Sequence, residues 1–259
     1  MGLHVIVEVD MRHGAKNGDD QELPPSSLRG RLCEVFFSAL LGEMIDPLMR
    51  RLGDKAELDD PIFGRVAGMD PLRERLIEWT RFLAERDARY DRTITVVGAD
   101  RDVTEGTLEL RDHEQHRSLP IALLMERRRE REVALRVFCA ASALGVEARG
   151  PSASATPVGA VPSFAADLLV AVAKRDAAAA TACFEQESIG IRDALGGEHP
   201  REATTRVLTR AMTATGVADN GQTCALEVTF EGGGSRLGLL VLQRGDSGLA
   251  RSLRVYSEI

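Results

Sequence analysis

Apolar residues recur every three to four positions in the first third of the chain, which is the spacing of one face of an α-helix. The pattern predicts a helix over residues 27–42 and a second, shorter helix over residues 43–53. A third helix is predicted over residues 69–85, with Asp70 as its N-cap and Pro71 at its first helical position. The apolar stripe of this third helix consists of Leu72, Leu76, Trp79 and Leu83.

Runs of strand length surround and follow the third helix. A short strand is predicted over residues 56–62, between the second and third helices. Four longer runs come after the third helix, at 92–99, 102–112, 118–127 and 132–140. Pro120 lies inside the third of these runs and has no N–H to donate, which predicts a bulge or an edge position. The first half therefore predicts three helices followed by an antiparallel meander.

The second half repeats this order in a compressed form. Two helices over 163–184, a short strand over 188–193 and a third helix over 199–215 are predicted, followed by strands over 222–230, 236–244 and 250–258. An ungapped match pairs residues 42–60 with residues 175–193, so that Asp193 corresponds to Asp60. The closing strands "ALRVF" and "SLRVY" also correspond. These matches indicate a duplication of one domain, with a shorter second copy.

A linker between the two copies is predicted over residues 146–162, which are rich in Pro, Ser, Ala and Gly and lack periodicity. The predicted domains are therefore residues 23–145 and 163–259. Residues 1–22 are predicted to be a flexible N-terminal extension. A chain of 259 residues is a comfortable length for two domains of this kind.

One strand in each half is apolar on both of its sides. These strands are "LPIALLM" in the first half and "LGLLVLQ" in the second, and each needs cover on both faces of its sheet. The simplest cover is to press the two sheets together. We therefore expect an intramolecular pseudo-dimer that is mainly monomeric, in which Leu240→Asp destabilises the pairing and a change at Gln243 does little.

Composition and charge narrow the classes of partner. The net charge of −7 argues against sequence-independent nucleic-acid binding, which needs a positive field. The basic run "ERRRERE" carries glutamates that neutralise it and is interpreted as a solvated hairpin tip. No apolar run approaches the roughly 18 residues of a membrane helix, so no membrane partner is expected.

The four cysteines are widely spaced in apolar strings, and no pair has the spacing of metal ligands. They are interpreted as buried, reduced thiols of a cytoplasmic protein. His113 and His116 lie three residues apart in what reads as a turn, so a solvated cluster is favoured over a metal site. Neither a metal nor an organic cofactor is expected.

The segment "LGDKAELDDPIFGRVAGMDPLRERLIEW" contains an acidic turn, a strand, an Asp-Pro pair, a glycine-punctuated loop and a helix. Together with the order of elements, it resembles the SnoaL-like polyketide cyclases and ketosteroid isomerases of the nuclear-transport-factor-2-like (NTF2-like) superfamily. The resemblance implies an α+β fold of two tandem cone-shaped, cystatin-like domains. Each domain would pack three helices on a curved antiparallel sheet with a mixed edge.

The resemblance implies that Asp60 is a general base at the mouth of an apolar cavity, and that Asp193 holds the equivalent position, with His199 and Tyr256 as possible neighbours. The implied cavity lining is Phe36, Leu58, Ile62, Trp79 and Leu123. Phe36 and Leu123 fall where the isomerases carry hydrogen-bond donors, and neither side chain can donate. The usual steroid isomerase route is therefore disfavoured.

Local geometry offers a second account of the Asp-Pro pair, because Asp before Pro favours an extended or turn conformation in any protein. Strand alternation places Asp60 with Leu58 and Ile62, and Asp59 on the opposite face. Two functions stay open: cofactor-independent acid/base chemistry of the cyclase or isomerase type, or a non-catalytic protein. The non-catalytic protein would bind a small hydrophobic molecule or serve as a structural pseudo-dimer.

Two further polar positions belong to the predicted strands. Glu105 and Glu109 share one strand face with Thr107, and alternation alone does not decide whether that face lines a cavity or meets water. Tyr256 is expected to cap a core strand with its hydroxyl pointing outward.

Overall fold

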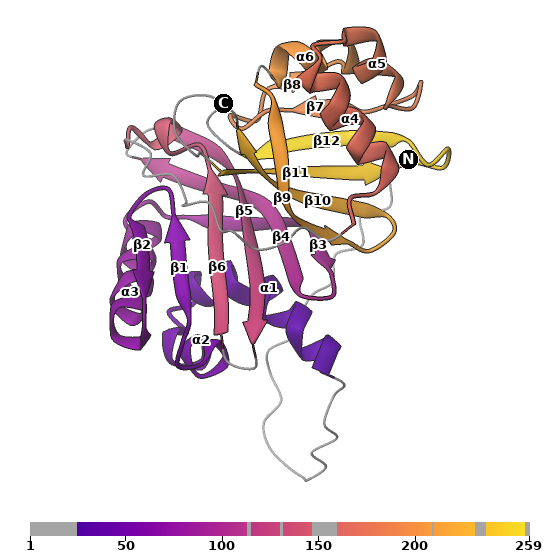
Figure 1. Ribbon diagram of the computed structural model, residues 1–259. Helices are drawn as coiled ribbons and strands as arrows, with labels where there is room; N and C mark the ends of the chain where they lie inside the picture. The colour runs from indigo at the N-terminus through magenta and orange to yellow at the C-terminus, as the bar shows by residue number, and fades with distance from the viewer. Residues whose placement is uncertain are drawn as a thin grey trace, which may run out of the picture.

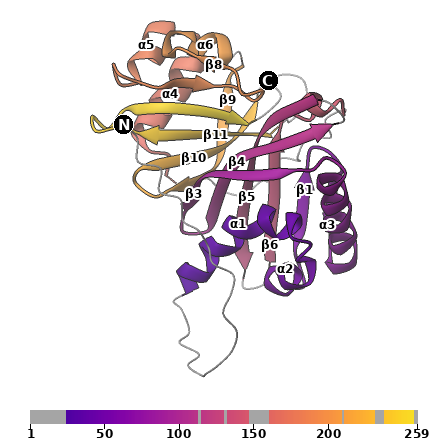
Figure 2. The ribbon, with the colours of Figure 1, turned by 180° about the vertical axis from the view of Figure 1, so that it is seen from behind.

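The computed structural model describes residues 25–112, 115–129, 132–146, 160–208, 210–230 and 237–256. It contains two six-stranded mixed sheets, one in each half of the chain, with helices on one face of each sheet (Figures 1 and 2). The α+β class predicted from the sequence is therefore confirmed. The predicted extension over residues 1–22 and most of the predicted linker over 146–162 lie outside the described residues.

Three α-helices in the first half form close to their predicted positions: α1 (Pro25–Leu41), α2 (Ile45–Leu52) and α3 (Met69–Ala84). The predicted stripe of α3 is buried, with Leu72, Leu76 and Leu83 at 0% exposure and Trp79 at 1%. The N-cap is Gly68, two residues before the predicted Asp70, so Asp70 lies inside the first turn of the helix. A short 3-10 helix, η1 (Ala141–Leu144), follows the last strand of this half.

The first sheet has the strand order β2-β1-β6-β5-β4-β3. Its strands are β1 (Glu57–Asp60), β2 (Gly64–Ala67), β3 (Arg89–Val97), β4 (Arg101–Asp112), β5 (Gln115–Arg129) and β6 (Glu132–Cys139). Only β1 and β6 run parallel; β2, which the sequence reading missed, closes a hairpin with β1. Pro120 pairs with Thr107 of β4, whereas pairing with β6 starts one residue later, at Ile121. Pro120 therefore lies at a local edge, as predicted.

The second half contains α4 (Ser163–Ala173), α5 (Ala177–Ala182), β7 (Gly190–Arg192), β8 (Glu198–His199), η2 (Arg201–Ala203), α6 (Thr204–Val207), β9 (Met212–Asp219), β10 (Thr223–Phe230), β11 (Leu237–Arg244) and β12 (Ala250–Tyr256). The predicted helix over residues 199–215 is wrong. Of the described residues in this stretch, only 201–207 are helical, and strand β9 begins at Met212. Threonines repeat through this stretch, and their β-branched side chains favour a strand over a helix.

The second sheet repeats the topology of the first, with the order β8-β7-β12-β11-β10-β9 and one parallel pair, β7 with β12. Each strand therefore has a counterpart, which supports the duplication. Residue counterparts follow from the register. For example, Ala134 pairs with Glu126 and Glu57 in the first sheet, and Ser252 pairs with Gln243 and Gly190 in the second.

The two sheets contact each other through the faces that point away from their helices. A cluster of buried apolar residues spans both sheets and is called the junction cluster below. Its members are Val96, Val103, Ala122, Leu124, Phe138, Ala218, Ala225, Leu237, Leu239, Val241 and Tyr256. Leu240 is not among them, because it packs into the core between the second sheet and its own helices. The expectation that Leu240 faces the first sheet is therefore wrong by one strand position.

Candidate functional site

Asp60 ends strand β1 and is completely buried. Its Oδ1 accepts hydrogen bonds from the backbone N–H groups of Ile62, at 3.0 Å, and Phe63, at 2.7 Å. Its Oδ2 forms an ion pair with Arg75 of α3, with 3.3 Å between Oδ2 and Nη1. Burial raises the pKa of Asp60, while the Phe63 N–H, the Trp79 indole and the Arg75 guanidinium partly offset that rise. The carboxylate therefore closes the β1–β2 turn and ties it to α3.

The residues expected to line a cavity beside Asp60 pack against one another as part of the first core. The exposure of Phe36, Leu58, Trp79, Ile62 and Leu123 is at most 6%. Trp79 also makes edge-to-face contacts with Phe63 and Phe82, at ring-centroid distances of 5.7 and 5.8 Å. Side chains thus fill the described interior around Asp60, and a hydrophobic ligand pocket there stays a prediction.

Asp193 has the same local role in the second domain. Its Oδ1 accepts the backbone N–H groups of Leu195, at 3.0 Å, and Gly197, at 2.8 Å, while its Oδ2 lies 2.7 Å from His199 Nε2. Burial alone would raise the pKa of Asp193, but His199 and the backbone N–H groups outweigh it and lower the pKa. Turn closure therefore accounts for an aspartate at this position in both copies.

Tyr256 does not accompany Asp193 and His199. Its side chain is 4% exposed and points into the junction between the sheets, where its hydroxyl donates to Glu105 Oε2 over 2.6 Å. The expected outward hydroxyl is therefore wrong. The same contact shows that Glu105 faces the junction between the sheets, where it is completely buried. Glu109 lies on the same strand face but is exposed.

Among the described residues, ion pairs cross between the domains. Arg136 Nη1 of the first domain lies 2.9 Å from Glu227 Oε1 of the second. Arg254 Nη2 of the second domain lies 2.5 Å from Glu105 Oε1 of the first. Glu105 and Glu227 are at most 1% exposed, so both carboxylates lie deep in the junction, while the Arg254 side chain is 15% exposed. Sequence reasoning missed both pairs, because their partners are far apart along the chain.

The strand register makes these two ion pairs counterparts of each other. Arg136 lies opposite Leu124, which lies opposite Val103; Arg254 lies opposite Val241, which lies opposite Ala225. Glu105 comes two residues after Val103, and Glu227 comes two residues after Ala225. Each domain therefore gives its arginine to the other domain's glutamate. Such reciprocity is the signature of an isologous, two-fold interface.

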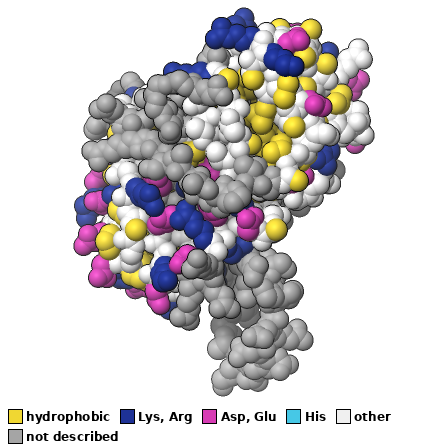
Figure 3. Space-filling view, viewed as in Figure 1, with side chains coloured by type: hydrophobic (Ala, Val, Ile, Leu, Met, Phe, Trp, Pro, Cys, Tyr) yellow, Lys and Arg dark blue, Asp and Glu magenta, His cyan; other side chains and the backbone are white. Residues whose placement is uncertain are grey.

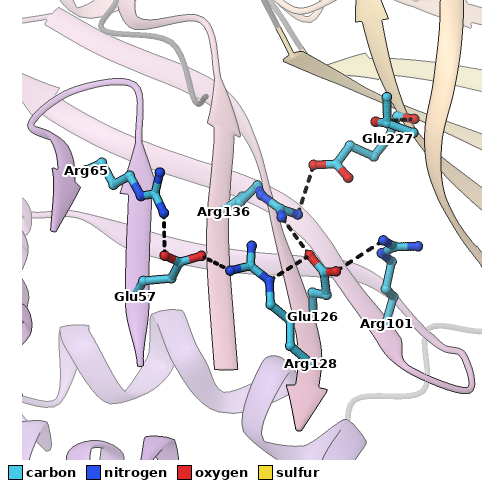
Figure 4. A network of polar contacts seen from close by, with 8 residues as sticks. Glu57, Arg65, Arg101, Glu126, Arg128, Arg136 and Glu227 are labelled. Atoms are coloured by element: carbon cyan, nitrogen blue, oxygen red, sulfur yellow. Dashed lines mark hydrogen bonds and ion pairs between the residues drawn. The ribbon is translucent and has the colours of Figure 1, made fainter. Parts of the chain in front are cut away.

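The Arg136 pair continues into a network within the first domain (Figure 4). Glu126 is 1% exposed and forms ion pairs with three arginines. The N···O distances are 2.6 Å to Arg136, 3.2 Å to Arg101 and 3.8 Å to Arg128. Arg128 also reaches Glu57 at 2.7 Å. Glu126 opens the basic run that was interpreted as a solvated hairpin tip. That interpretation is wrong for Glu126, because tertiary pairing with arginines allows its burial.

Arg101 can enter the junction because Gly216 of β9 has no side chain. A Cβ atom at position 216 would lie 2.9 Å from Arg101 Cζ and 3.0 Å from Glu227 Oε2. Burial raises the pKa of Glu227, and the charges of Arg136 and Arg101 partly offset this rise. The glycine thus leaves the space in which the guanidinium sits beside the buried carboxylate.

The other residues considered from the sequence lie outside this network. All four cysteines are free and buried. His116 is exposed, and His113 lies outside the described residues. Over the described ranges, no three His, Cys, Asp or Glu side chains gather as a set that could hold a metal ion. The described helices also include none long and apolar enough to cross a membrane.

On the visible face of the first domain, acidic and basic side chains alternate, whereas hydrophobic ones gather over the second domain (Figure 3).

No protein-family model matches the chain, and no curated protein matches it. Among solved structures, the chain is similar to a protein from Kribbella flavida at 17% identity, covering 46% of this chain and 91% of that one, with a TM-score of 0.37. It is also similar to an NTF2-like protein of unknown function from Cytophaga hutchinsonii, at 16% identity over 45% of this chain and 94% of that one (TM-score 0.33). The chain is also similar to an LEH-like epoxide hydrolase from M. tuberculosis, at 19% identity over 44% of this chain and 84% of that one (TM-score 0.36). Each of these matches spans less than half of this chain.

Proposed function

We propose that this tandem NTF2-like chain is a non-catalytic intramolecular pseudo-dimer, in which the second domain takes the place of a partner subunit for the first. The observation that carries this proposal is the reciprocal pair of buried ion pairs, Arg136 with Glu227 and Arg254 with Glu105. A self-complementary surface of this kind is what two identical subunits would use. In this chain both copies of that surface are present, so the protein is expected to be mainly monomeric.

The energetics of the junction favour a closed arrangement. Burial of a Val, Leu or Phe side chain stabilises by about 1.5–3 kcal/mol, and the junction cluster contains several such residues. Separation of the domains would also leave Glu105 and Glu227 without the arginines that neutralise them. Unpaired apolar surface and unpaired charge both oppose opening. Because the pairing is intramolecular, its extent should not depend on protein concentration.

The absence of catalysis is supported by the environment of Asp60. Both carboxylate oxygens already have partners, and the surrounding side chains are packed as a core. A general base must come within hydrogen-bonding reach of the proton that it removes. Packing of this kind keeps a substrate away from the carboxylate.

Small-angle scattering and sedimentation of the full chain test the pairing. A compact chain of 259 residues has a radius of gyration of about 18 Å, apart from any extended tail. Arg136→Glu should place like charges beside Glu126 and Glu227 and increase the radius of gyration, while the far-ultraviolet circular dichroism stays unchanged. Adding Glu227→Arg should restore the compact form. A wild-type homodimer, or an unchanged radius in Arg136→Glu, would overturn the proposal.

Acid/base chemistry at Asp60 on a small hydrophobic molecule is the second candidate function. It is supported by the raised pKa of Asp60 and by the adjacent Arg75, since a raised pKa makes the carboxylate a stronger base for proton transfer. The test is a set of enolisable ketones and ring-closing substrates, assayed with wild type, Asp60→Asn and Asp193→Asn. Turnover that is lost only in Asp60→Asn would establish this function and overturn the non-catalytic proposal.

A further inference from the structure

A hollow of about 180 Å³ lies where one end of the domain junction opens. Thr93 of the first domain is on its rim, and Ile189 together with residues of β7, β8, β11 and β12 of the second domain forms the rest of its wall. The polar members of that wall include Glu198, Gln243, Ser252 and Arg254. At about 30 Å³ per water molecule, the hollow has room for roughly six waters or a molecule of comparable size.

At the equivalent place in the first domain, most positions carry large charged side chains. One row across the first sheet reads Arg101, Glu126, Ala134 and Glu57, by direct pairing of neighbouring strands. The equivalent row across the second sheet reads Thr223, Gln243, Ser252 and Gly190. Three charged side chains of the first row are therefore replaced by smaller or neutral ones in the second. The two-fold likeness of the domains is broken at this row, and the hollow lies beside it.

The substitution also changes the surroundings of the equivalent arginines. Arg136 pairs with two carboxylates, those of Glu126 and Glu227. Arg254 pairs with Glu105, but the position equivalent to Glu126 is the neutral Gln243. Arg254 Nη1 donates instead to the Ser252 hydroxyl over 3.3 Å, and its buried Nε has no hydrogen-bond partner among the described atoms. The second domain thus lacks one carboxylate that the first domain supplies from its own chain.

We infer that the hollow binds a small molecule with a carboxylate group, which takes the place beside Arg254 that the Glu126 carboxylate takes beside Arg136. A charged donor that is buried without a partner is costly, and a bound carboxylate would remove that cost. The Ser252 hydroxyl and the Gln243 amide supply further donors, while the exposed Ile189 provides apolar surface for a short carbon chain. This site goes beyond the proposed pseudo-dimer, because domain pairing alone does not require a ligand.

Binding is tested by titrating the full-length protein with sodium acetate, propionate and butyrate, while following the Arg Nε–H signals by NMR. A saturable shift of the Arg254 signal is expected with at least one carboxylate, with no shift for butyramide or butylamine at the same concentrations. The absence of a saturable shift with all three carboxylates would overturn the inference.

The decisive variant is Gln243→Glu, which provides from the chain the carboxylate that Glu126 provides in the first domain. It should weaken carboxylate binding at least tenfold and raise the melting temperature of the ligand-free protein. Gln222→Glu makes the same chemical change at an exposed turn residue next to β10 and should leave binding unchanged. Equal binding by wild type and Gln243→Glu would contradict the inference.

Ser252→Ala is a milder second variant, and a several-fold loss of affinity is expected because it removes one donor from the wall. Unchanged affinity in Ser252→Ala would argue against this position for the carboxylate. The radius of gyration of each sample separates the two proposals: loss of binding in a compact protein concerns the ligand site alone, whereas expansion concerns the domain pairing.

Discussion

Replacement of Arg136 by methionine is the most direct perturbation of the domain junction. Arg136 is 3% exposed and connects Glu126, at 2.6 Å, to Glu227, at 2.9 Å. After Arg136→Met, Glu126 keeps Arg101 and Arg128, but Glu227 loses its direct ion partner while staying buried. Breaking a buried ion pair by removing one partner costs about 3–5 kcal/mol. A loss of that size is a large share of the roughly 5–15 kcal/mol that stabilises a typical protein.

Methionine is long and apolar, so Arg136→Met retains most of the side-chain volume and the measured loss reports mainly on charge. Adding Glu227→Gln removes the unpaired carboxylate and should recover part of the loss. The coupling energy of the double-mutant cycle is expected to be about 1–3 kcal/mol, within the range for residues in one network. The counterpart cycle, Arg254→Met with Glu105→Gln, should show coupling of the same sign, because the register makes the two pairs equivalent.

The loss in Arg136→Met should also depend on pH. The pKa of Glu227 is raised in the folded protein, so the buried carboxylate opposes folding above that pKa and the opposition fades as the pH falls through it. Removal of Arg136 raises the pKa further, since a charge that stabilised the carboxylate is gone. The deficit in the free energy of unfolding should therefore be larger at neutral pH than at mildly acidic pH.

Urea unfolding followed by circular dichroism measures these free energies. Arg89→Met, at an exposed position of β3, is the matched control and should change stability by less than about 0.5 kcal/mol. Additivity within about 0.5 kcal/mol in both cycles would refute the reciprocal pairing. A deficit for Arg136→Met that grows as the pH falls would refute the assigned role of Glu227.

Four other perturbations have defined outcomes. Gly216→Ala should cost about 1–3 kcal/mol in thermal unfolding, because the added Cβ would lie 2.9 Å from Arg101 Cζ; a neutral effect would contradict this packing. Leu239→Asp should open the junction and increase the radius of gyration while secondary structure is retained; intact compactness would count against the cluster as the contact between domains. Asp193→Asn should lower the melting temperature at neutral pH, and the difference from wild type should vanish as the pH falls below about 4. The reason is that a carboxylate with a lowered pKa contributes stability only while it is ionised. A lower melting temperature that persists in acid would contradict this. Limited proteolysis should cut first within residues 146–162 and leave two compact fragments, whereas first cuts within residues 60–140 would argue against two domains.

The amino-acid sequence by itself determined the elements whose signals are local. The 3.6-residue period of α3 and the strand-length apolar runs of β3 to β6 predicted those elements at nearly the observed bounds. The duplication was visible from the match that pairs Asp60 with Asp193, and both aspartates close a turn by accepting backbone N–H groups. Turn closure needs only neighbouring residues, which is why the Asp-Pro pair carried that reading from the start. Residues 199–215 were misread because threonine-rich alternation and weak helical spacing coexist over a short stretch.

Tertiary structure decided everything that depends on which faces meet. Alternation along β11 separates Leu239 from Leu240, but both sides of the strand are apolar, so the pattern does not say which side meets the other domain. The pairing of Arg136 with Glu227 joins strands from different domains. No local sequence pattern predicts a contact between residues so far apart along the chain. A charged side chain reads as solvated until a partner of opposite sign is found for it. Folding supplies that partner, which is why burial of Glu105 and Glu126 emerged only once the two sheets were placed against each other.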